Sequence, residues 1–161
     1  GVDYVDTYQF NITANALDER LWVVDGTTYS GAPLMAGVTD DEGNPGLQPG
    51  EAVLAGGIYF EEADGTENHI GCATAATDPA DGQVRYFGNN GMPTTLETRD
   101  TTNPLVAYYL VANIEPGPVT AKAFMDGDEI GSTSLFVYAD AISISNIYAT
   151  TASDPEPAGC Q

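Results

Sequence analysis

Oxygen-bearing side chains gather in one polar segment, DDEGNPGLQPGE at residues 40–51. Four of them match the first, third, fifth and twelfth positions of a calcium-binding loop: Asp40, Glu42, Asn44 and Glu51. Carboxylate and amide oxygens are ligands that Ca²⁺ prefers, although Pro45 stands where such loops carry glycine. The segment therefore predicts one of two alternatives, a Ca²⁺ site or a solvated acidic loop, and no other cofactor is expected.

The chain has a single histidine, His69, three residues before Cys72. A histidine-based nucleophilic enzyme would need this one imidazole as its general base, and the sequence has no G-x-S-x-G turn for a serine nucleophile. One histidine and two cysteines also cannot supply the ligands of a structural zinc or haem site. We therefore expect no enzymatic activity. The remaining enzymatic alternative is a hydrolase with paired carboxylates, because 24 acidic residues always offer some pair.

Two cysteines, Cys72 and Cys160, allow one intrachain pairing. The bridge would close a loop of roughly ninety residues and stabilise the fold by about 4–5 kcal/mol in the chain-entropy model, provided that the compartment is oxidising. The alternative is two free thiols. We expect the disulfide, and with it a C-terminal tail, residues 151–161, that is tethered through Cys160.

The chain carries 24 acidic and only four basic residues, which gives a formal net charge of −20. Nucleic acid and anionic membrane surfaces are excluded as partners, because binding to them needs clusters of Lys and Arg. No hydrophobic run approaches the roughly 18 residues of a membrane span, so membrane insertion is not expected. Divalent cations, salty surroundings and basic or neutral ligands suit this charge.

Apolar and polar residues alternate with a period of two throughout the chain, which is typical of half-buried β-strands. We expect strands at residues 3–12, 21–25, 52–60, 70–77, 83–87, 105–114, 119–125, 132–139 and 141–149. Dipeptides that favour tight hairpin turns lie between them: Asp25-Gly26, Asp64-Gly65, Asp81-Gly82, Asn90-Gly91 and Asp126-Gly127. The helical candidate is residues 13–21, with Thr13 or Asn15 as its N-cap.

These elements predict a single domain over residues 1–150. Residues 1–48 would contribute N-terminal strands and the acidic loop, and residues 49–150 would form the core. Residues 40–51 and 88–104 are expected to be long polar insertions carried on the strands.

Three stretches of the core follow an order of features that is found in a known family. They are the strand at residues 52–60, the turn TDPADG at 77–82 that leads into an aromatic strand, and the step IEPGPVT at 114–120. In this order the chain resembles the carboxypeptidase regulatory-like modules, which are small sandwiches of the transthyretin-like or prealbumin-like type. The resemblance implies an all-β fold, an Ig-like or prealbumin-like antiparallel β-sandwich with long polar loop insertions. It also implies a non-catalytic accessory or surface module, in which Asp78 and Asp81 form a turn.

The expected function is that of a secreted or cell-surface structural module, such as a filament, surface-array or adhesin subunit, that assembles through its strand edges and loops. Edge strands offer unpaired backbone groups to a neighbour. The segment 3–12 is the expected assembly strand, with its larger side chains on one parity: Tyr4, Tyr8, Phe10 and Ile12. The expected partners are further copies of the chain or other surface proteins.

An alternative of another class is an accessory module that binds carbohydrate or Ca²⁺. Trp22 and the tyrosine-rich strands would then form a face on which sugar rings stack.

Overall fold

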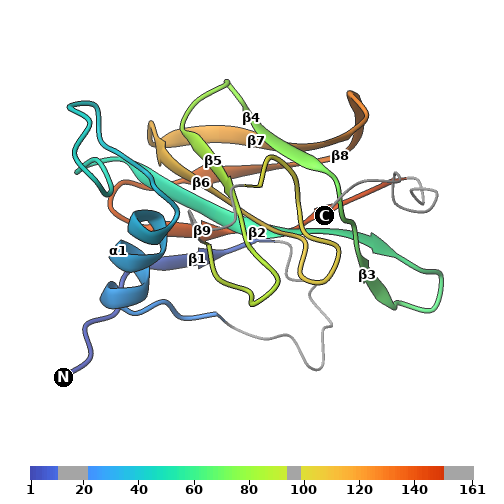
Figure 1. Ribbon diagram of the computed structural model, residues 1–161, viewed down its shortest axis with the longest axis horizontal. Coiled ribbons are helices and arrows are strands. Elements are labelled where there is room, and N and C mark those ends of the chain that lie inside the picture. The colour runs from blue at the N-terminus through green and yellow to red at the C-terminus, as the bar shows by residue number, and fades with distance from the viewer. Residues whose placement is uncertain (11–21, 94–98, 151–161) are drawn as a thin grey trace.

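The structure is a computed structural model that describes residues 1–10, 22–93 and 99–150. In these residues the chain forms one helix and a series of strands arranged in two facing sheets (Figure 1). The elements are β1 (Thr7–Gln9), α1 (Gly26–Met35), β2 (Ala52–Glu61), β3 (Glu67–His69), β4 (Thr74–Asp78), β5 (Gln83–Tyr86), β6 (Tyr108–Ile114), β7 (Gly117–Met125), β8 (Asp128–Val137), β9 (Ile142–Ile144) and β10 (Ile147–Tyr148). The predicted all-β sandwich is confirmed.

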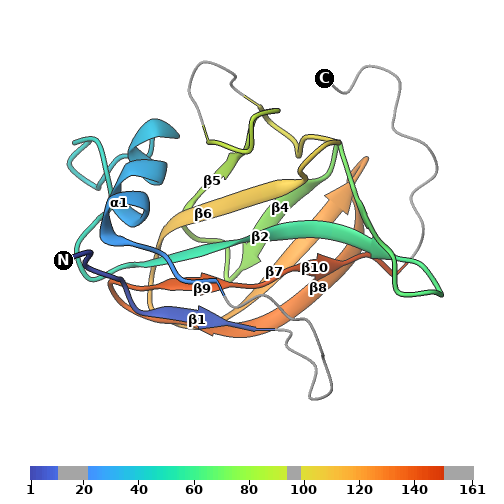
Figure 2. The ribbon, with the colours of Figure 1, turned by 90° about the horizontal axis from the view of Figure 1, so that it is seen from below.

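The two sheets differ in size. The larger has seven strands in the order β1-β9-β2-β6-β5, with β10 and β3 also paired to β2. The smaller has three strands in the order β4-β7-β8. Figure 2 shows β1 and β8 together along the lower margin of the molecule, with β5 on the opposite side.

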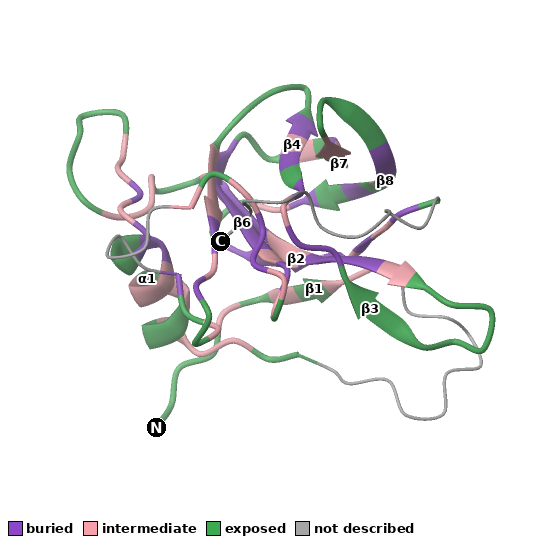
Figure 3. Cartoon of the chain, turned by 45° about the vertical axis from the view of Figure 1, so that its right-hand side comes forward, coloured by how far each residue is buried: buried purple, intermediate pink, exposed green. Residues whose placement is uncertain are grey.

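The inner faces of the two sheets bury an apolar core. Because successive side chains of a strand point to opposite faces, Leu54 of β2 and Val111 of β6 face Val119 of β7 and Val137 of β8. The buried hydroxyl of Tyr109 donates a hydrogen bond to the Ser145 backbone oxygen at 2.8 Å, so this polar atom in the core is satisfied. Buried residues run along β2 and β6 in Figure 3.

The helix α1 begins at the predicted hairpin turn, directly after the predicted strand 21–25. Asp25 is its N-cap, and Oδ1 of Asp25 accepts from the backbone N–H groups of Thr27 at 2.9 Å and Thr28 at 3.0 Å. Asp25-Gly26 thus begins a helix instead of a hairpin. The predicted strand 21–25 is wrong over its described residues, because they form only an isolated bridge between Asp25 and Tyr4. The predicted helix 13–21 lies outside the described residues.

The helix packs on the outer face of the larger sheet, where Tyr29 contacts the cluster of Val53, Leu110 and Ile142. No helix within the described ranges has the length and hydrophobicity needed to cross a bilayer.

Three strand pairings are parallel, where the sequence predicted an antiparallel sandwich. β1 pairs in parallel with β9, and β9 and β10 each pair in parallel with β2. The predicted strand 141–149 is divided between β9 and β10 at Ser145 and Asn146, where the chain runs close to Gly56 of β2. A Cβ atom on Gly56 would lie 1.9 Å from the Ser145 backbone oxygen, so only glycine permits this close approach.

The predicted turns have different outcomes. Asp126 and Gly127 join β7 to β8 with φ of 53° and 93°, as a two-residue hairpin turn requires, and this prediction is confirmed. Asp64-Gly65 lies in the predicted β2–β3 hairpin. Asp81-Gly82 connects β4 to β5, which belong to different sheets, so it forms a corner of the sandwich and not a hairpin.

Candidate functional site

The predicted assembly strand is part of this chain's own sheet. Ile142 N donates to the Asp6 oxygen at 3.1 Å, and Phe10 N donates to the Ile144 oxygen at 2.9 Å, which fixes β1 against β9. Phe10 packs against the core, and Ile12 lies outside the described residues. A strand is confirmed here, whereas its role in assembly stays a prediction.

The segment before α1 covers part of the other edge of this strand. Val5 N donates to the Val24 oxygen at 3.0 Å, and Trp22 N donates to Oε1 of Gln9 at 3.0 Å. β1 therefore offers less free edge to a neighbour than the sequence suggested.

Aromatic side chains meet where β1 approaches the end of β8. Tyr8 stacks on Tyr138 with ring centroids 4.0 Å apart, and the ring centroids of Phe136 and Tyr138 are 4.8 Å apart. Tyr8 is 37% exposed, Phe136 is 43% exposed, and Tyr4 at the start of the same segment is 66% exposed. We call the surface formed by β1, β8 and these aromatic side chains the β1/β8 side.

β8 is the end strand of its sheet, so one of its edges faces away from β7. Pro118 lies opposite Phe136 and has no N–H, and the Phe136 oxygen accepts from Oγ of Ser143 at 3.2 Å. Backbone groups alternate in direction along an antiparallel strand, so those of Ser132 and Ser134 also point away from β7.

Among the described residues, both ends of this outward edge have hydrogen-bond partners and its middle has none. At one end the Ile130 oxygen accepts from Thr150 N at 2.9 Å, and at the other the Phe136 oxygen is bonded to Ser143. Between them, no described residue bonds to the outward N–H and C=O groups of Ser132 and Ser134.

The sequence alone did not identify Ser132 and Ser134 as candidate interface residues. The available signal was the uncharged run GSTSLFVYA at 131–139, in a chain with 24 acidic residues.

On the opposite side of the sandwich, side chains bond the edge of β5. The guanidinium group of Arg85 donates to the backbone oxygens of Ala36 at 2.9 Å, Gly37 at 3.1 Å and Val84 at 2.8 Å. Phe87 N pairs with β6, so by alternation the Val84 oxygen points away from β6, and Arg85 occupies it.

A side chain also bonds part of the β4 edge. Ala75 N donates to the buried Tyr86 hydroxyl at 2.7 Å, and burial raises the pKa of Tyr86. Oγ1 of Thr77 donates to the Asp81 oxygen at 2.9 Å and accepts from Asp81 N at 3.1 Å. We call this surface, formed by the edges of β4 and β5, the β4/β5 side.

Asp78 and Asp81 lie in the corner between these strands, and both carboxylates are bonded within the chain. Oδ2 of Asp78 forms an ion pair with Nζ of Lys122 at 2.7 Å. Asp81 accepts from Gly82 N at 2.8 Å and from Glu115 N at 2.7 Å, which ties the corner to the turn between β6 and β7. The predicted turn is present here.

Three of the four predicted Ca²⁺ ligands lie in one small turn. Oδ1 of Asp40 accepts from the backbone N–H groups of Glu42 at 3.0 Å and Asn44 at 2.7 Å, and Oδ2 accepts from Nδ2 of Asn44 at 3.0 Å. The Asn44 side chain is the main cause of the lowered pKa of Asp40. Glu51 has no hydrogen bond to this turn and lines a separate groove.

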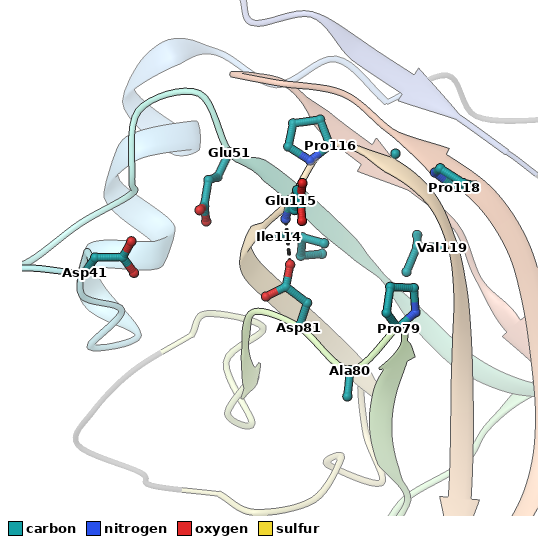
Figure 4. A pocket seen from close by; sticks show the side chains of 11 residues that line it. Asp41, Glu51, Pro79, Ala80, Asp81, Ile114, Glu115, Pro116, Pro118 and Val119 are labelled. Carbon is teal, nitrogen blue, oxygen red and sulfur yellow. Dashed lines mark hydrogen bonds between the residues drawn. The ribbon is translucent and has the colours of Figure 1, made fainter.

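That groove has a volume of about 800 Å³ and lies at the end of the sandwich where β4 turns into β5 and β6 turns into β7 (Figure 4). Four carboxylate side chains line it together with prolines: Asp41, Glu51, Asp81 and Glu115. Burial raises the pKa of Glu51, and the negative charges of Asp41, Asp81 and Glu115 raise it further. The described residues contain no group of three or more His, Cys, Asp or Glu side chains arranged to hold a metal ion. The Ca²⁺ site stays a prediction.

A row of rings lies on the outer face of the larger sheet. The strand registers place Tyr59 of β2 between His69 of β3 and Tyr148 of β10, with centroid distances of 5.1 Å and 6.0 Å. Tyr59 folds back over Gly57, where a Cβ atom would lie 2.3 Å from its ring. His69 also meets Tyr108 edge to face at 73°. Because the rings are tilted against one another, they form a packing cluster and not a flat stacking surface.

The predicted sugar-stacking face is not assembled in this row. Trp22 is 53% exposed but takes part in no ring contact with other described residues. The hydroxyl of Tyr148 donates to Oε1 of Glu67 at 2.5 Å, and its pKa is raised to about 12, mainly by burial. Carbohydrate binding stays a prediction.

Cys72 follows β3 and has a left-handed φ of 62°. Its backbone N donates to the Thr102 oxygen at 3.0 Å, and Cys72 is not a free thiol. The expected partner, Cys160, lies outside the described residues, so the Cys72–Cys160 bridge stays a prediction.

No protein-family model matches the chain, and no curated protein matches it in sequence. Among solved structures, the chain is similar to the minor pilin GBS52 of the Gram-positive pathogen Streptococcus agalactiae. The identity is 10%, the match covers 71% of this chain and 51% of the pilin chain, and the TM-score is 0.37. The chain thus matches about half the length of that pilin. The strand pairing itself defines the protein as a two-sheet β-sandwich module.

Proposed function

We propose that this protein is a non-enzymatic assembly module of an extracellular or cell-surface structure, and that copies of it bind one another through the β1/β8 side. The observation that carries the proposal is the open middle of the β8 edge, beside the exposed rings of Tyr8 and Phe136. Backbone groups without partners and exposed aromatic side chains are what an added strand or subunit would cover.

The closed β4/β5 side supports this choice of surface. Arg85 bonds the outward Val84 oxygen of β5, and the Tyr86 hydroxyl bonds the outward Ala75 N–H of β4, so fewer backbone groups of these two edges are available to a neighbour. Exposed apolar side chains are common on proteins, but the β1/β8 side combines them with an open strand edge.

The test is the mass of the full chain in solution, measured by light scattering over a wide concentration range. We expect reversible oligomers, and we expect the double substitution Tyr8→Ser with Phe136→Ser to weaken association by about tenfold or more, since each ring contributes buried apolar area. The control is Leu105→Ser, which removes an apolar side chain that is 65% exposed and lies in the connection before β6, away from the β1/β8 side.

A wild-type chain that stays monomeric at every concentration would contradict the proposal. So would an equal loss of association in the Leu105→Ser control, because the effect would then not be specific to the β1/β8 side.

A further inference from the structure

We propose that β8 pairs antiparallel with β8 of a second copy of this chain, so that the two three-stranded sheets become one continuous sheet. The inference rests on the proposed function and deepens it by naming the strand and the register. It starts from Ser132 and Ser134, whose outward backbone groups have no partner among the described residues.

The occupied ends of the edge restrict the register. The Ile130 oxygen is bonded to Thr150 and the Phe136 oxygen to Ser143, so a partner strand can use only the stretch between them. About a two-fold axis, Ser132 of each copy can lie opposite Ser134 of the other. Each of these two pairs then exchanges two backbone hydrogen bonds, and all the open groups of both serines are satisfied.

The charges on β8 favour the antiparallel orientation. Asp128 and Glu129 lie at the start of the strand, and the stretch from Ile130 to Val137 carries no charge. A parallel pair in register would place Asp128 against Asp128 of the second copy. The antiparallel register places Glu129 opposite Val137, which keeps the acidic ends of the two strands apart.

The β8 edge also lacks the usual protection against pairing. Natural edge strands carry lysine, proline, inward-pointing charges or bulges that prevent edge-to-edge association. From Ser132 to Phe136 the edge has serine, threonine, leucine and phenylalanine, and its one register shift lies earlier, opposite Ala123 and Phe124. A second copy presents the same neutral edge, which makes the surface self-complementary.

The first experiment compares Ser132→Pro with Ser132→Ala in the full chain. Proline removes an N–H that points away from β7, so the strand keeps its own ladder, whereas alanine retains the N–H. We expect Ser132→Pro to weaken the dimer by about tenfold or more and Ser132→Ala to leave it unchanged, with thermal unfolding close to wild type in both. Equal dimerisation of the proline variant would overturn the inference.

A second experiment tests the register by crosslinking. In the proposed pair, position 132 of one copy lies about 5.5 Å, Cα to Cα, from position 134 of the other, within the range for a disulfide. Equivalent positions are diagonal, at about 7–8 Å, and outside it. An oxidised mixture of Ser132→Cys and Ser134→Cys chains should therefore form disulfide dimers, and either variant alone should form few. Dimers in equal yield from a single variant would exclude this register.

Salt provides a further readout. Each copy carries a net charge of −20, so the two repel, and sodium chloride should strengthen the dimer by screening this repulsion. Association that weakens with salt would contradict a neutral backbone interface.

The variants also separate the two proposals. Oligomers that depend on Tyr8 and Phe136 but tolerate Ser132→Pro would support the proposed function and reject β8 pairing. A monomeric wild type would reject both.

Discussion

The two sides of the sandwich leave their strand edges in different states. On the β4/β5 side, Arg85 and Tyr86 bond backbone groups that would otherwise face solvent. On the β1/β8 side, the groups of Ser132 and Ser134 stay without a partner among the described residues. Unprotected edges invite pairing. The proposal that copies pair at the β1/β8 side rests on this difference.

The same contrast holds for charge. The groove at the β4–β5 corner gathers Asp41, Glu51, Asp81 and Glu115, whereas the middle of β8 has no charged side chain. Two copies would therefore repel one another less at the middle of β8 than at this groove.

The largest expected effect is on the closed side. Arg85→Met removes three hydrogen bonds to backbone oxygens and opens the β5 edge, so it should lower the free energy of unfolding by about 2–3 kcal/mol. Urea unfolding measures this loss, and light scattering should show new self-association through β5. Arg85→Lys is the control for charge. It should recover little stability, because one ammonium group cannot replace the fork of donors. A variant as stable as wild type would remove the basis for calling this side closed.

A smaller effect is expected for Tyr86→Phe, which leaves the Ala75 N–H buried and unpaired. Thermal and urea unfolding should show a loss of about 1–2 kcal/mol. The matched control on the β1/β8 side is Tyr138→Phe, because the Tyr138 hydroxyl has no hydrogen bond to the described residues. This substitution should change the free energy of unfolding by less than about 0.5 kcal/mol. Equal losses in the two variants would show that the two sides do not differ in this respect.

The smallest effect concerns pH. Burial and neighbouring carboxylates raise the pKa of Glu51, so ionised Glu51 destabilises the folded state, and this penalty disappears as pH falls through the raised pKa. Glu51→Gln should therefore raise the melting temperature at pH 7 and leave it unchanged near pH 3, where the carboxyl is protonated in both states. Glu115→Gln removes one of the neighbouring charges and should act in the same direction, but less. A Glu51→Gln variant that melts lower at pH 7 would contradict this account.

Much of the strand content could be predicted from the sequence, because alternation depends only on which side chains face the core. The segment of β2 and the turn at Asp126 and Gly127 are examples. Alternation has the same period in parallel and antiparallel strands, so the parallel pairing of β1 with β9 could not be predicted from it.

The helix was missed because its residues disfavour helices. Gly26, Gly31 and Pro33 lie within α1, and Asp25 before glycine is also a common hairpin signal. The helix is held by its Asp25 cap and by the contact of Tyr29 with the sheet, and the second of these is tertiary.

The candidate surfaces could be predicted least. Glu51 was expected to share ligands with Asp40, yet it lines a groove with Asp41 of the same loop and with Asp81 and Glu115 of two other loops. Which backbone groups of β8 stay open also depends on Ser143 and Thr150, which reach this edge only after the whole sandwich has formed.

The pairing of β1 with β9 joins residues 7–9 to residues 142–144, nearly the full length of the chain apart. During synthesis on the ribosome, residues 7–9 emerge before their partner strand and have no strand to join until residues 142–144 have been made. Tyr8 and Phe10 therefore lack their native partners in the nascent chain until that point, and closing this long loop is among the slow, non-local steps of folding.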